Sequence, residues 1–418
     1  MPVISGSHSG IGIGGDPPAP CRSYRRTMNP STSPPGPFPP APAVPRIAAL
    51  DVLRGFALGG ILMVNVSAMA NLLGGDGHPA DDLVGLLFAG KFYVLFSFLF
   101  GYSFTMQLRS AERDGAGARA RTVRRCLALI VLGALHAVFL WLGDILLLYG
   151  ITGLILLLMR AIRPRTALIV AGTLMILVTL LSLATSTLEA GDPTGGLFDP
   201  ANQERMRAEF RSGWLEAAGV RWELYSAIGV LLVVFQLPTV LAMFLVGLAA
   251  GRTRLLEDPE RYLPFLPRIQ LIGYGVGGAV TLAVSASRWA DRGAAPFLEP
   301  LSELASPLLS AAYAATVLRL MHRYPAVPAA LAPAGRIAAS NYIGQSVATS
   351  ILFTVAGLEL SPWAVLGVAA VVYALQLPLS AWWTRRHRYG PVEWVLRAVT
   401  YGPRRARPAG GAARREAR

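Results

Sequence analysis

The sequence predicts an all-α, polytopic integral membrane protein, a helical bundle with about ten transmembrane helices. Of its 418 residues, 53% are hydrophobic and only 15% are charged, whereas a soluble protein carries about a quarter charged residues. Mean hydropathy is +0.48. The apolar residues also fall in runs of roughly 20 residues, the length of a membrane helix, rather than in the short alternating strands of a porin-like barrel.

Ten apolar spans can be delimited, and each is long enough, or nearly so, to cross a ~30 Å hydrocarbon core. They lie at residues 48–70, 84–107, 123–142, 144–160, 166–187, 225–250, 268–287, 301–320, 337–357 and 362–384. Arginines cluster in the loops after every even-numbered span, and acidic residues such as Asp81 and Asp82 occupy the opposite side. The positive-inside rule therefore predicts a multi-pass protein of the cytoplasmic (inner) membrane with both termini cytoplasmic.

Composition shifts divide the chain into five predicted parts. They are a disordered Pro/Gly-rich tail (1–45), an N-terminal five-helix membrane unit that holds the candidate site (46–187), an extracytoplasmic amphipathic segment (188–224), a C-terminal five-helix membrane unit (225–402) and a basic disordered tail (403–418). The segment 188–224 places Phe210, Trp214 and Leu215 among charges, which favours either a helix on the outer membrane surface or a solvated loop helix. Met28 is an alternative start to Met1.

The net charge of +14 comes almost entirely from arginine, because Lys91 is the only lysine. Topology explains this charge better than nucleic-acid binding does. The predicted partners are the lipid bilayer and a small-molecule or glycan acceptor outside the cytoplasm, and a homo-oligomer remains open. Two cysteines, Cys21 and Cys126, predict no disulfide and no cysteine metal site. Zinc-ligand spacings, a Walker loop and a Gly-x-Ser-x-Gly elbow are absent from the sequence, so no metal is predicted.

The first span carries three polar residues that hydrocarbon normally excludes. Asp51 and Arg54 are three residues apart, so they share a helix face. They form either an ion pair that anchors the helix at the headgroups or a site at which Arg54 binds a phosphate in fork geometry. Asn65 follows eleven residues later, on nearly the same face and ~16 Å nearer the outside. Its amide must hydrogen-bond across helices.

Further polar residues are predicted to lie in the same outer layer as Asn65. Lys91 either snorkels outward or contacts a carboxylate such as Asp144. His136 lies near the outer end of the third span, and His78 lies in an outer loop. A lone histidine in an apolar helix is more often structural than catalytic. Five such groups in one layer nevertheless favour general acid–base chemistry, so all five are candidate catalytic residues.

The C-terminal third repeats this pattern of polar residues in apolar helices. Asn341, Gln345 and Ser346 lie at helical spacings in "GRIAASNYIGQS". In "GPVEWVLRAVTYG", Glu393 and Arg397 are four residues apart and are predicted to pair. This stretch is expected to be an interfacial helix that closes the bundle. Glycines at 55 and 59, and at 273 and 277, have the spacing of close helix contacts.

Several blocks resemble a known family across roughly residues 46–402. The blocks are "RIAALDVLRGFALGGILMVN", "KFYVLFSFLFGYSF", "RRCLALIVLGALHAVFLWLGDILLLYGITG" and "GRIAASNYIGQS…QLPLSAWWTRRHRYGPVEWVLRAVTY". They look like the YeiB-like family, domain-of-unknown-function family 418, which is similar to the heparan-glucosaminide acetyltransferases and, more distantly, to the acyltransferase-3 membrane enzymes. Asp51, Gly55, Asn341, Gln345, Ser346, Glu393 and Arg397 belong to the resembling motifs.

The resemblance implies transfer of an acyl group from cytosolic acetyl-CoA, or another acyl-CoA, to an acceptor beyond the membrane. Acyltransferase-3 enzymes carry a histidine where this chain has Asn65. By analogy with the heparan-type enzymes, Asn65 orients the site and His78 is the base or transient acyl carrier, with His136 as the alternative. The predicted binding residues for coenzyme A phosphates are Arg54, Arg124 and Arg125. The rival functions are a transporter or lipid flippase, with helix breaks at Pro238 and Pro378, and a non-catalytic membrane partner.

Overall fold

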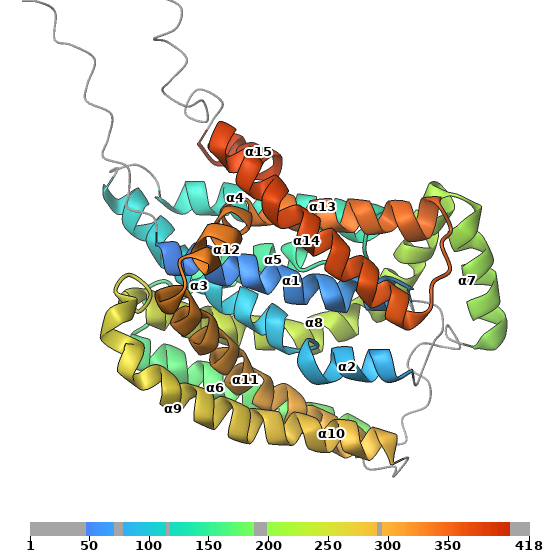
Figure 1. Ribbon diagram of the computed structural model, residues 1–418, viewed down its shortest axis with the longest axis horizontal. Helices are drawn as coiled ribbons and strands as arrows, with labels where there is room; N and C mark the ends of the chain where they lie inside the picture. Colours follow the sequence, from blue (N-terminus) through green and yellow to red (C-terminus); the bar gives the residue numbers. More distant parts are fainter. Residues whose placement is uncertain (1–46, 71–77, 114–117, 188–198, 291–294, 402–418) are drawn as a thin grey trace, which may run out of the picture. The chain divides into compact units, whose positions relative to one another are not determined.

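A computed structural model describes residues 47–70, 78–113, 118–187, 199–290 and 295–401, and these residues form helices and short connections without a strand (Figure 1). The predicted tails, 1–45 and 403–418, lie outside the described residues. The elements are α1 (Ala48–Ala70), α2 (Pro79–Leu87), α3 (Lys91–Arg113), α4 (Ala118–Phe139), α5 (Leu146–Leu158), α6 (Pro164–Thr187), α7 (Pro200–Ser212), α8 (Trp214–Arg252), the 3-10 helix η1 (Pro259–Phe265), α9 (Leu266–Ile272), the π-helix η2 (Gly273–Gly278), α10 (Ala279–Trp289), α11 (Ala295–Arg323), α12 (Ala326–Arg336), α13 (Ala338–Ser350), the π-helix η3 (Ile351–Val355), α14 (Pro362–Arg386) and α15 (Pro391–Tyr401).

Eight helical stretches among the described residues are long and apolar enough to cross a membrane. This confirms a multi-pass helical membrane protein. Two of the ten predicted spans fall on helices that are too short or too polar to count by length and composition. The predicted span 144–160 falls on α5, which has only 13 residues. The predicted span 337–357 falls on α13 and η3, where polar residues such as Asn341 and Gln345 lower the hydropathy.

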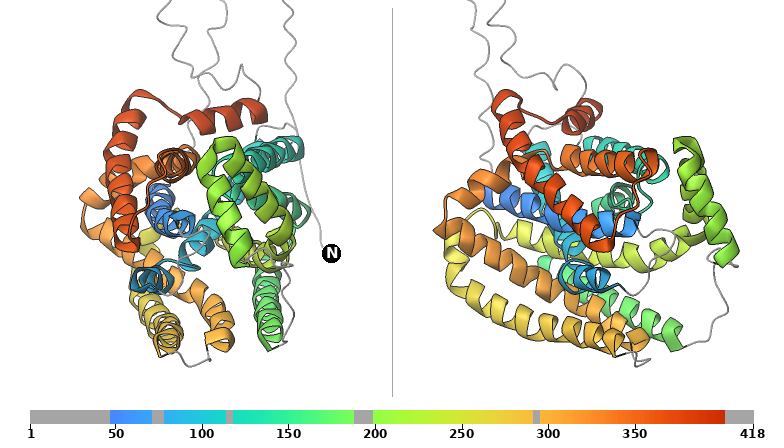
Figure 2. Two further views of the ribbon diagram at one scale, coloured as in Figure 1. Left: turned by 90° about the vertical axis from the view of Figure 1, so that its right-hand side faces the viewer. Right: turned by 45° about the vertical axis from the view of Figure 1, so that its right-hand side comes forward.

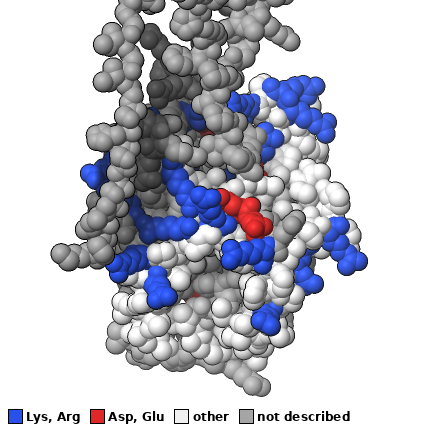
Figure 3. Space-filling model, turned by 90° about the vertical axis from the view of Figure 1, so that its left-hand side faces the viewer, with Lys and Arg blue, Asp and Glu red and all other residues white. Residues whose placement is uncertain are grey.

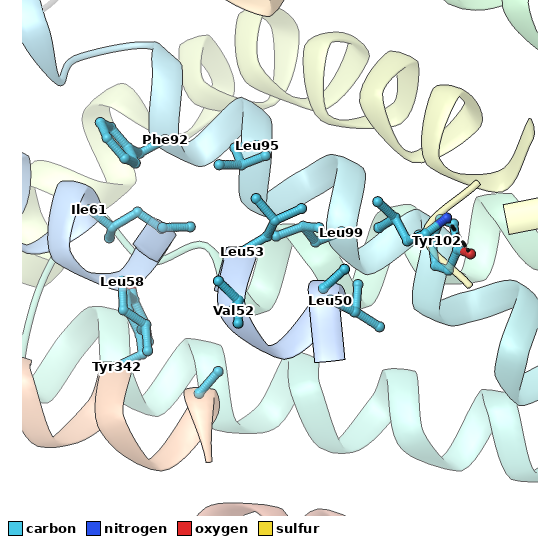
Figure 4. Close-up of a cluster of buried hydrophobic side chains, with 14 of the residues drawn as sticks. Leu50, Val52, Leu53, Leu58, Ile61, Phe92, Leu95, Leu99, Tyr102 and Tyr342 are labelled. Carbon is cyan, nitrogen blue, oxygen red and sulfur yellow. Dashed lines mark hydrogen bonds between the residues drawn. The ribbon is translucent and has the colours of Figure 1, made fainter. Parts of the chain in front are cut away.

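The interior of the bundle is built around α1. Two thirds of its most apolar stretch (67%) is buried, and it packs against α3, α12, α13 and α14 (Figures 1 and 2). Leu53, Leu58 and Ile61 of α1 meet Phe92 of α3 and Tyr342 of α13 in one apolar cluster (Figure 4). A helix surrounded on all sides must be apolar all round, so each polar residue on α1 needs a partner on a neighbouring helix.

Glycines allow the closest helix approaches, as their spacing predicts. The Gly55 backbone lies against the Leu331 backbone of α12. A Cβ added to Gly59 would lie only 2.8 Å from the Tyr373 ring of α14. Gly273 and Gly277 lie in the same way against α11. Small residues let helix backbones approach where larger side chains would hold them apart.

The predicted amphipathic segment 188–224 is not one element. Residues 188–198 lie outside the described residues, α7 follows, and residues 214–224 form the first three turns of the 39-residue helix α8. Apolar packing explains the difference, because Val220 and Leu224 are buried with Met206 of α7 and Leu142. The start of α8 therefore packs over the end of α4, while Trp214 and Leu215 are exposed.

Basic side chains gather on the end of the bundle where α1 begins and α3 ends (Figure 3). Arg109 Nη1 lies 2.9 Å from Glu257 Oε1, and Arg252 donates hydrogen bonds to the carbonyl oxygens of Arg160 and Ile162. These arginines tie the ends of α3, α5 and α8 together. The charge asymmetry is the one from which a cytoplasmic orientation was predicted, and the orientation itself stays a prediction.

Candidate functional site

Three side chains, two from neighbouring parts of the chain and one 210 residues away, form a chain of close contacts at the end of α4. His136 Nδ1 lies 2.9 Å from Asp144 Oδ1, and both side chains are only 1% exposed. On the other side of the ring, His136 Nε2 lies 2.9 Å from Ser346 Oγ. This is the arrangement in which a carboxylate orients an imidazole, the imidazole acts as general base, and the hydroxyl is the nucleophile.

The local fold fixes this arrangement from both sides. Asp144 Oδ2 accepts a hydrogen bond of 2.7 Å from the Leu147 backbone N–H, so the carboxylate also caps the start of α5. On α13, Ser350 Oγ donates to the Leu140 carbonyl oxygen at 2.9 Å. The end of α4 and the residue that follows it are therefore bound to α13 at two points, through His136 to Ser346 and through Leu140 to Ser350.

Tyr342 and Asn65 extend the cluster toward α1. The Tyr342 ring centroid lies 5.0 Å from that of His136. Its buried hydroxyl lies beside the Asn65 side chain and the Ile145 backbone, without a hydrogen bond of good geometry. Asn65, His136 and Asp144, three of the five predicted catalytic residues, thus fall in one cluster. Ser346, predicted only as a motif residue, and Tyr342, which was not singled out, complete it.

Several buried polar atoms in this cluster are poorly satisfied. His136 Nδ1 and Asp144 Oδ1 are close but not aligned as a hydrogen bond, and the Tyr342 hydroxyl has no aligned partner among the described residues. Buried polar groups are nearly always hydrogen-bonded, because an unmet donor or acceptor costs about 1–3 kcal/mol. His136 and Asp144 still interact at 2.9 Å, so the Tyr342 hydroxyl is the group of this cluster that needs a further partner.

His78 lies apart from this cluster. It is the N-cap residue of α2, where its Nδ1 accepts a 3.1 Å hydrogen bond from the Ala80 backbone N–H. Its ring meets Trp363 edge-on at 6.1 Å. His78 therefore does not contact His136, although the two were predicted to lie in one layer. The ring accepts one of the free N–H groups at the helix start, and Pro79 suits the first helical position, which explains the place of His78.

Lys91 is also elsewhere, and it does not contact Asp144. Its Nζ donates to the Gly85 carbonyl oxygen at 2.7 Å, and its side chain is buried. It lines a polar cavity of about 190 Å³ between α3, α10 and α11, together with Arg288, Glu299 and Glu303. Asp144 instead takes His136 as its partner, because the turn after α4 brings the two within one side-chain length.

The predicted phosphate-binding residues differ in their surroundings. Arg54 donates to Ser103 Oγ and lies 3.6 Å from Asp51, so the predicted ion pair within α1 is confirmed. Arg125 is half-buried over the Phe100 ring, close enough to Arg54 to repel it electrostatically. Arg124 is exposed. Two half-buried, positively charged guanidinium groups close to each other are suited to bind an anion that carries several phosphates.

The C-terminal motif has a structural role that differs from the predicted one. Glu393 accepts hydrogen bonds from the Ala339 and Ser340 backbone N–H groups, at 2.8 and 3.1 Å, at the start of α13. The predicted pair with Arg397 is therefore wrong, and Arg397 stacks on the rings of Tyr389 and Tyr401. A carboxylate gains more from the free N–H groups and positive dipole end of a helix than from an exposed i, i+4 pair.

Amide side chains connect α13 to its neighbours deeper in the bundle. Asn341 Nδ2 donates to Ser380 Oγ at 2.9 Å and to the Ala334 carbonyl oxygen at 3.0 Å. Gln345 Nε2 donates to Gln376 Oε1 at 2.7 Å. These bonds hold α13 in register between α1 and α14, which sets the height of Ser346 opposite His136.

The beginning of α8 is bound to the end of α4 and to η3, the two elements next to the cluster. The Trp214 indole N–H donates to the Phe139 carbonyl oxygen at 2.7 Å. Arg221, 1% exposed, donates to Thr354 Oγ1 at 3.0 Å and lies over the Phe210 ring. Sequence reasoning placed Arg221 in an exposed segment, and its only signal was the apolar residues that flank it in "AAGVRWELY".

The bundle and its buried polar cluster define a multi-pass helical membrane protein, and comparison with known proteins agrees with this class. Residues 46–199 match a family model described as heparan-alpha-glucosaminide N-acetyltransferase, catalytic, and residues 250–403 match one described as protein of unknown function (DUF418). The chain belongs to the YeiB-like DUF418 family. His136 and Asp144 lie in the first matched region and Ser346 lies in the second, so the cluster joins the two.

Curated relatives cover most of the chain. The uncharacterized protein YxaH of Bacillus subtilis is 31% identical over 85% of this chain and 94% of its own length. The uncharacterized protein YeiB of Escherichia coli is 30% identical over 85% of this chain and 96% of its own length. No solved structure matches the chain.

Proposed function

We propose that the protein is a membrane acyltransferase that moves an acyl group, such as acetyl, from cytosolic acyl-CoA to an acceptor on the far side of the membrane. The observation that carries the proposal is the match of residues 46–199 to an acetyltransferase catalytic region that includes the buried His136–Asp144 pair. The acceptor is a sugar, a lipid or a metabolite with a hydroxyl or amine group.

The donor enters from the basic end of the bundle in this proposal. Arg54 and Arg125 bind the phosphates of coenzyme A, and Arg124 contributes from the surface. Asn65 lies eleven residues beyond Arg54 on the same helix, which is ~16 Å along the axis. An extended pantetheine arm spans such a distance, so the thioester arrives at the level of Asn65, Tyr342 and His136.

The acid–base chemistry falls to His136. Asp144 beside Nδ1 keeps the proton on that nitrogen, which leaves Nε2 free to accept a proton. Burial of both side chains excludes water and strengthens their interaction. Asn65 and the Tyr342 hydroxyl are donors for the negative charge that develops on the thioester oxygen.

The proposed topology has ten crossings, with both termini in the cytoplasm and the protein in the inner membrane. α5 completes the fourth crossing, because Gly150 and Gly153 of α5 lie against Cys126 of α4 while Leu147 lies against Gly133, an antiparallel arrangement. Cysteine labelling from outside intact cells tests it. Gly143, exposed in the α4–α5 turn, should be labelled as Gly143→Cys and Arg163→Cys should not, and the reverse would contradict the orientation.

Acetyl-CoA binding to the purified protein tests the donor site. Arg54→Gln should weaken binding at least tenfold, since it removes a charge-assisted phosphate contact. Arg385→Gln, which removes the same charge from an exposed position at the end of α14, should change binding less than twofold. Equal effects of the two variants, or no binding by the wild-type protein, would argue against the proposed function.

Transport is the second candidate, and the polar cavity around Lys91 favours it. A cavity of about 190 Å³ lined by two cations and two carboxylates accommodates a small polar solute. The predicted helix breaks at Pro238 and Pro378 are wrong, because α8 and α14 continue through these prolines. Solute uptake into proteoliposomes that contain no acyl-CoA would support transport over acyl transfer.

A further inference from the structure

The geometry points to Ser346 as a nucleophile that carries the acyl group as a covalent ester between donor and acceptor. This inference rests on the proposed function and deepens it, because it turns a direct transfer into two half-reactions. Its basis is the contact chain in which Asp144, His136 and Ser346 follow one another at 2.9 Å each.

The hydroxyl of Ser346 is oriented for this role. With the proton of the imidazole on Nδ1, facing Asp144, Nε2 accepts from the Ser346 hydroxyl. The other acceptor within reach of that hydroxyl is the Tyr342 carbonyl oxygen at 3.4 Å, a longer contact. Serine is a weak nucleophile until a base takes its proton, and the shorter contact is to that base.

Packing alone gives a poor account of the cluster. A serine in a membrane helix usually bonds its own backbone one turn earlier, as Thr349 does to the Gln345 carbonyl oxygen at 2.9 Å. Ser346 makes this bond only at 3.4 Å, to the Tyr342 carbonyl oxygen, and its shorter contact, 2.9 Å, is to a buried histidine on another helix that lies beside a carboxylate. α13 also passes into the π-helix η3 one turn beyond Ser346, and π-helical turns recur at functional sites.

The first half-reaction transfers the acyl group from coenzyme A to the enzyme. Ser346 Oγ attacks the thioester carbonyl carbon while His136 Nε2 takes the hydroxyl proton. The new C–O bond forms, the C–S bond breaks, and the departing sulfur receives the proton from His136. Free coenzyme A leaves toward the basic end, and the ester remains in a cluster from which water is excluded.

The second half-reaction regenerates the serine. An acceptor hydroxyl or amine gives its proton to His136 Nε2 and attacks the ester carbonyl carbon. The bond to Ser346 Oγ breaks, and this oxygen takes the proton back from His136. Trp214 and Arg221 bind the start of α8 to Phe139 and Thr354, next to the cluster, and in this proposal the acceptor approaches the ester from that side.

Isotope exchange tests the covalent step without knowledge of the acceptor. Purified protein in nanodiscs is mixed with acetyl-CoA and labelled free coenzyme A, and label in acetyl-CoA is measured. An acyl-enzyme predicts exchange by the wild-type protein and a loss of at least about a hundredfold in Ser346→Ala and in His136→Ala. Ser287→Ala, which removes a serine hydroxyl bonded to the Val284 carbonyl oxygen within α10, should keep the wild-type rate.

Two further measurements separate a nucleophile from a structural serine. Ser346→Cys preserves size and supplies a nucleophile, so it should exchange and should hold acetyl as a thioester. Peptide mapping of the wild-type protein after acetyl-CoA treatment should find acetyl on Ser346. Acetyl-CoA binding without exchange would overturn the serine ester and leave acyl transfer standing, whereas absence of binding would overturn both. Exchange that survives in Ser346→Ala but not in His136→Ala would assign the acyl group to the imidazole.

Discussion

His136 and Asp144 face each other across the turn between α4 and α5, with Nδ1 and Oδ1 2.9 Å apart and both side chains 1% exposed. The turn brings them together, and α13 adds Ser346 on the other side of the ring. A carboxylate and an imidazole buried together must interact strongly, because neither is hydrated. The predictions below separate what this pair does from what the surrounding packing does.

Asp144→Asn should abolish the base function of His136 while it preserves the fold. An amide at this position fits the same space and still caps Leu147, but it favours the wrong tautomer of the imidazole. Coenzyme A exchange should fall about a thousandfold or more, as for an orienting carboxylate in a serine triad. Thermal unfolding in detergent should shift by a few degrees at most. A variant that keeps at least a tenth of the wild-type exchange would contradict the role of Asp144.

His78→Asn and Lys91→Met should leave coenzyme A exchange within about threefold of wild type, since neither residue contacts the His136 cluster. Asparagine keeps the N-cap of α2, and methionine fills the volume of the lysine stem. The result distinguishes the cluster from the predicted outer layer of five residues. Loss of exchange in His78→Asn, with unchanged thermal stability, would show that His78 is the base.

Glu393→Ala should destabilise the protein through the start of α13. The substitution removes the acceptor for the Ala339 and Ser340 backbone N–H groups, and the loss of a helix cap costs about 1 kcal/mol. Asp258→Ala is the control, because this N-cap carboxylate makes no capping hydrogen bond. Thermal unfolding should report a lower midpoint for Glu393→Ala alone, and equal midpoints for the two variants would refute the capping role.

Gly55→Ala should force α1 and α12 apart. Its Cβ would overlap the Leu331 backbone, and overpacking of this kind costs about 1–3 kcal/mol. Gly172→Ala in α6 is the matched control, since nothing lies within 4 Å of its added Cβ. That variant should be neutral or slightly stabilised by the better helix propensity of alanine. Unfolding midpoints that rank the two variants in the opposite order would contradict the packing.

The helices were readable from the sequence because hydrocarbon imposes long apolar runs, and the Asp51–Arg54 pair was readable because helical spacing fixes it. Contacts between different helices could not be read from the sequence in the same way. Ser346 lies 210 residues from His136, and no local pattern links them. To predict a common layer for His78, Lys91 and Asp144, one must know where each side chain points. His78 points to the start of α2, which it caps, and Lys91 points into the polar cavity.

The C-terminal motif shows a second limit. The i, i+4 spacing of Glu393 and Arg397 predicted a local pair, but the unpaired N–H groups of α13 are stronger partners for a carboxylate, and they come from another part of the chain. Likewise, Arg221 looked like part of an exposed loop, whereas the long continuation of α8 buries it. In each case tertiary packing overrode a reasonable local prediction.

A structure of the protein bound to a non-hydrolysable acetyl-CoA analogue tests the central claim most directly. The account predicts phosphates at Arg54 and Arg125 and the acetyl carbonyl carbon within about 3.5 Å of Ser346 Oγ, the distance of a reactive pose. An analogue bound with its acetyl group away from His136, for example in the polar cavity beside Lys91, would contradict it.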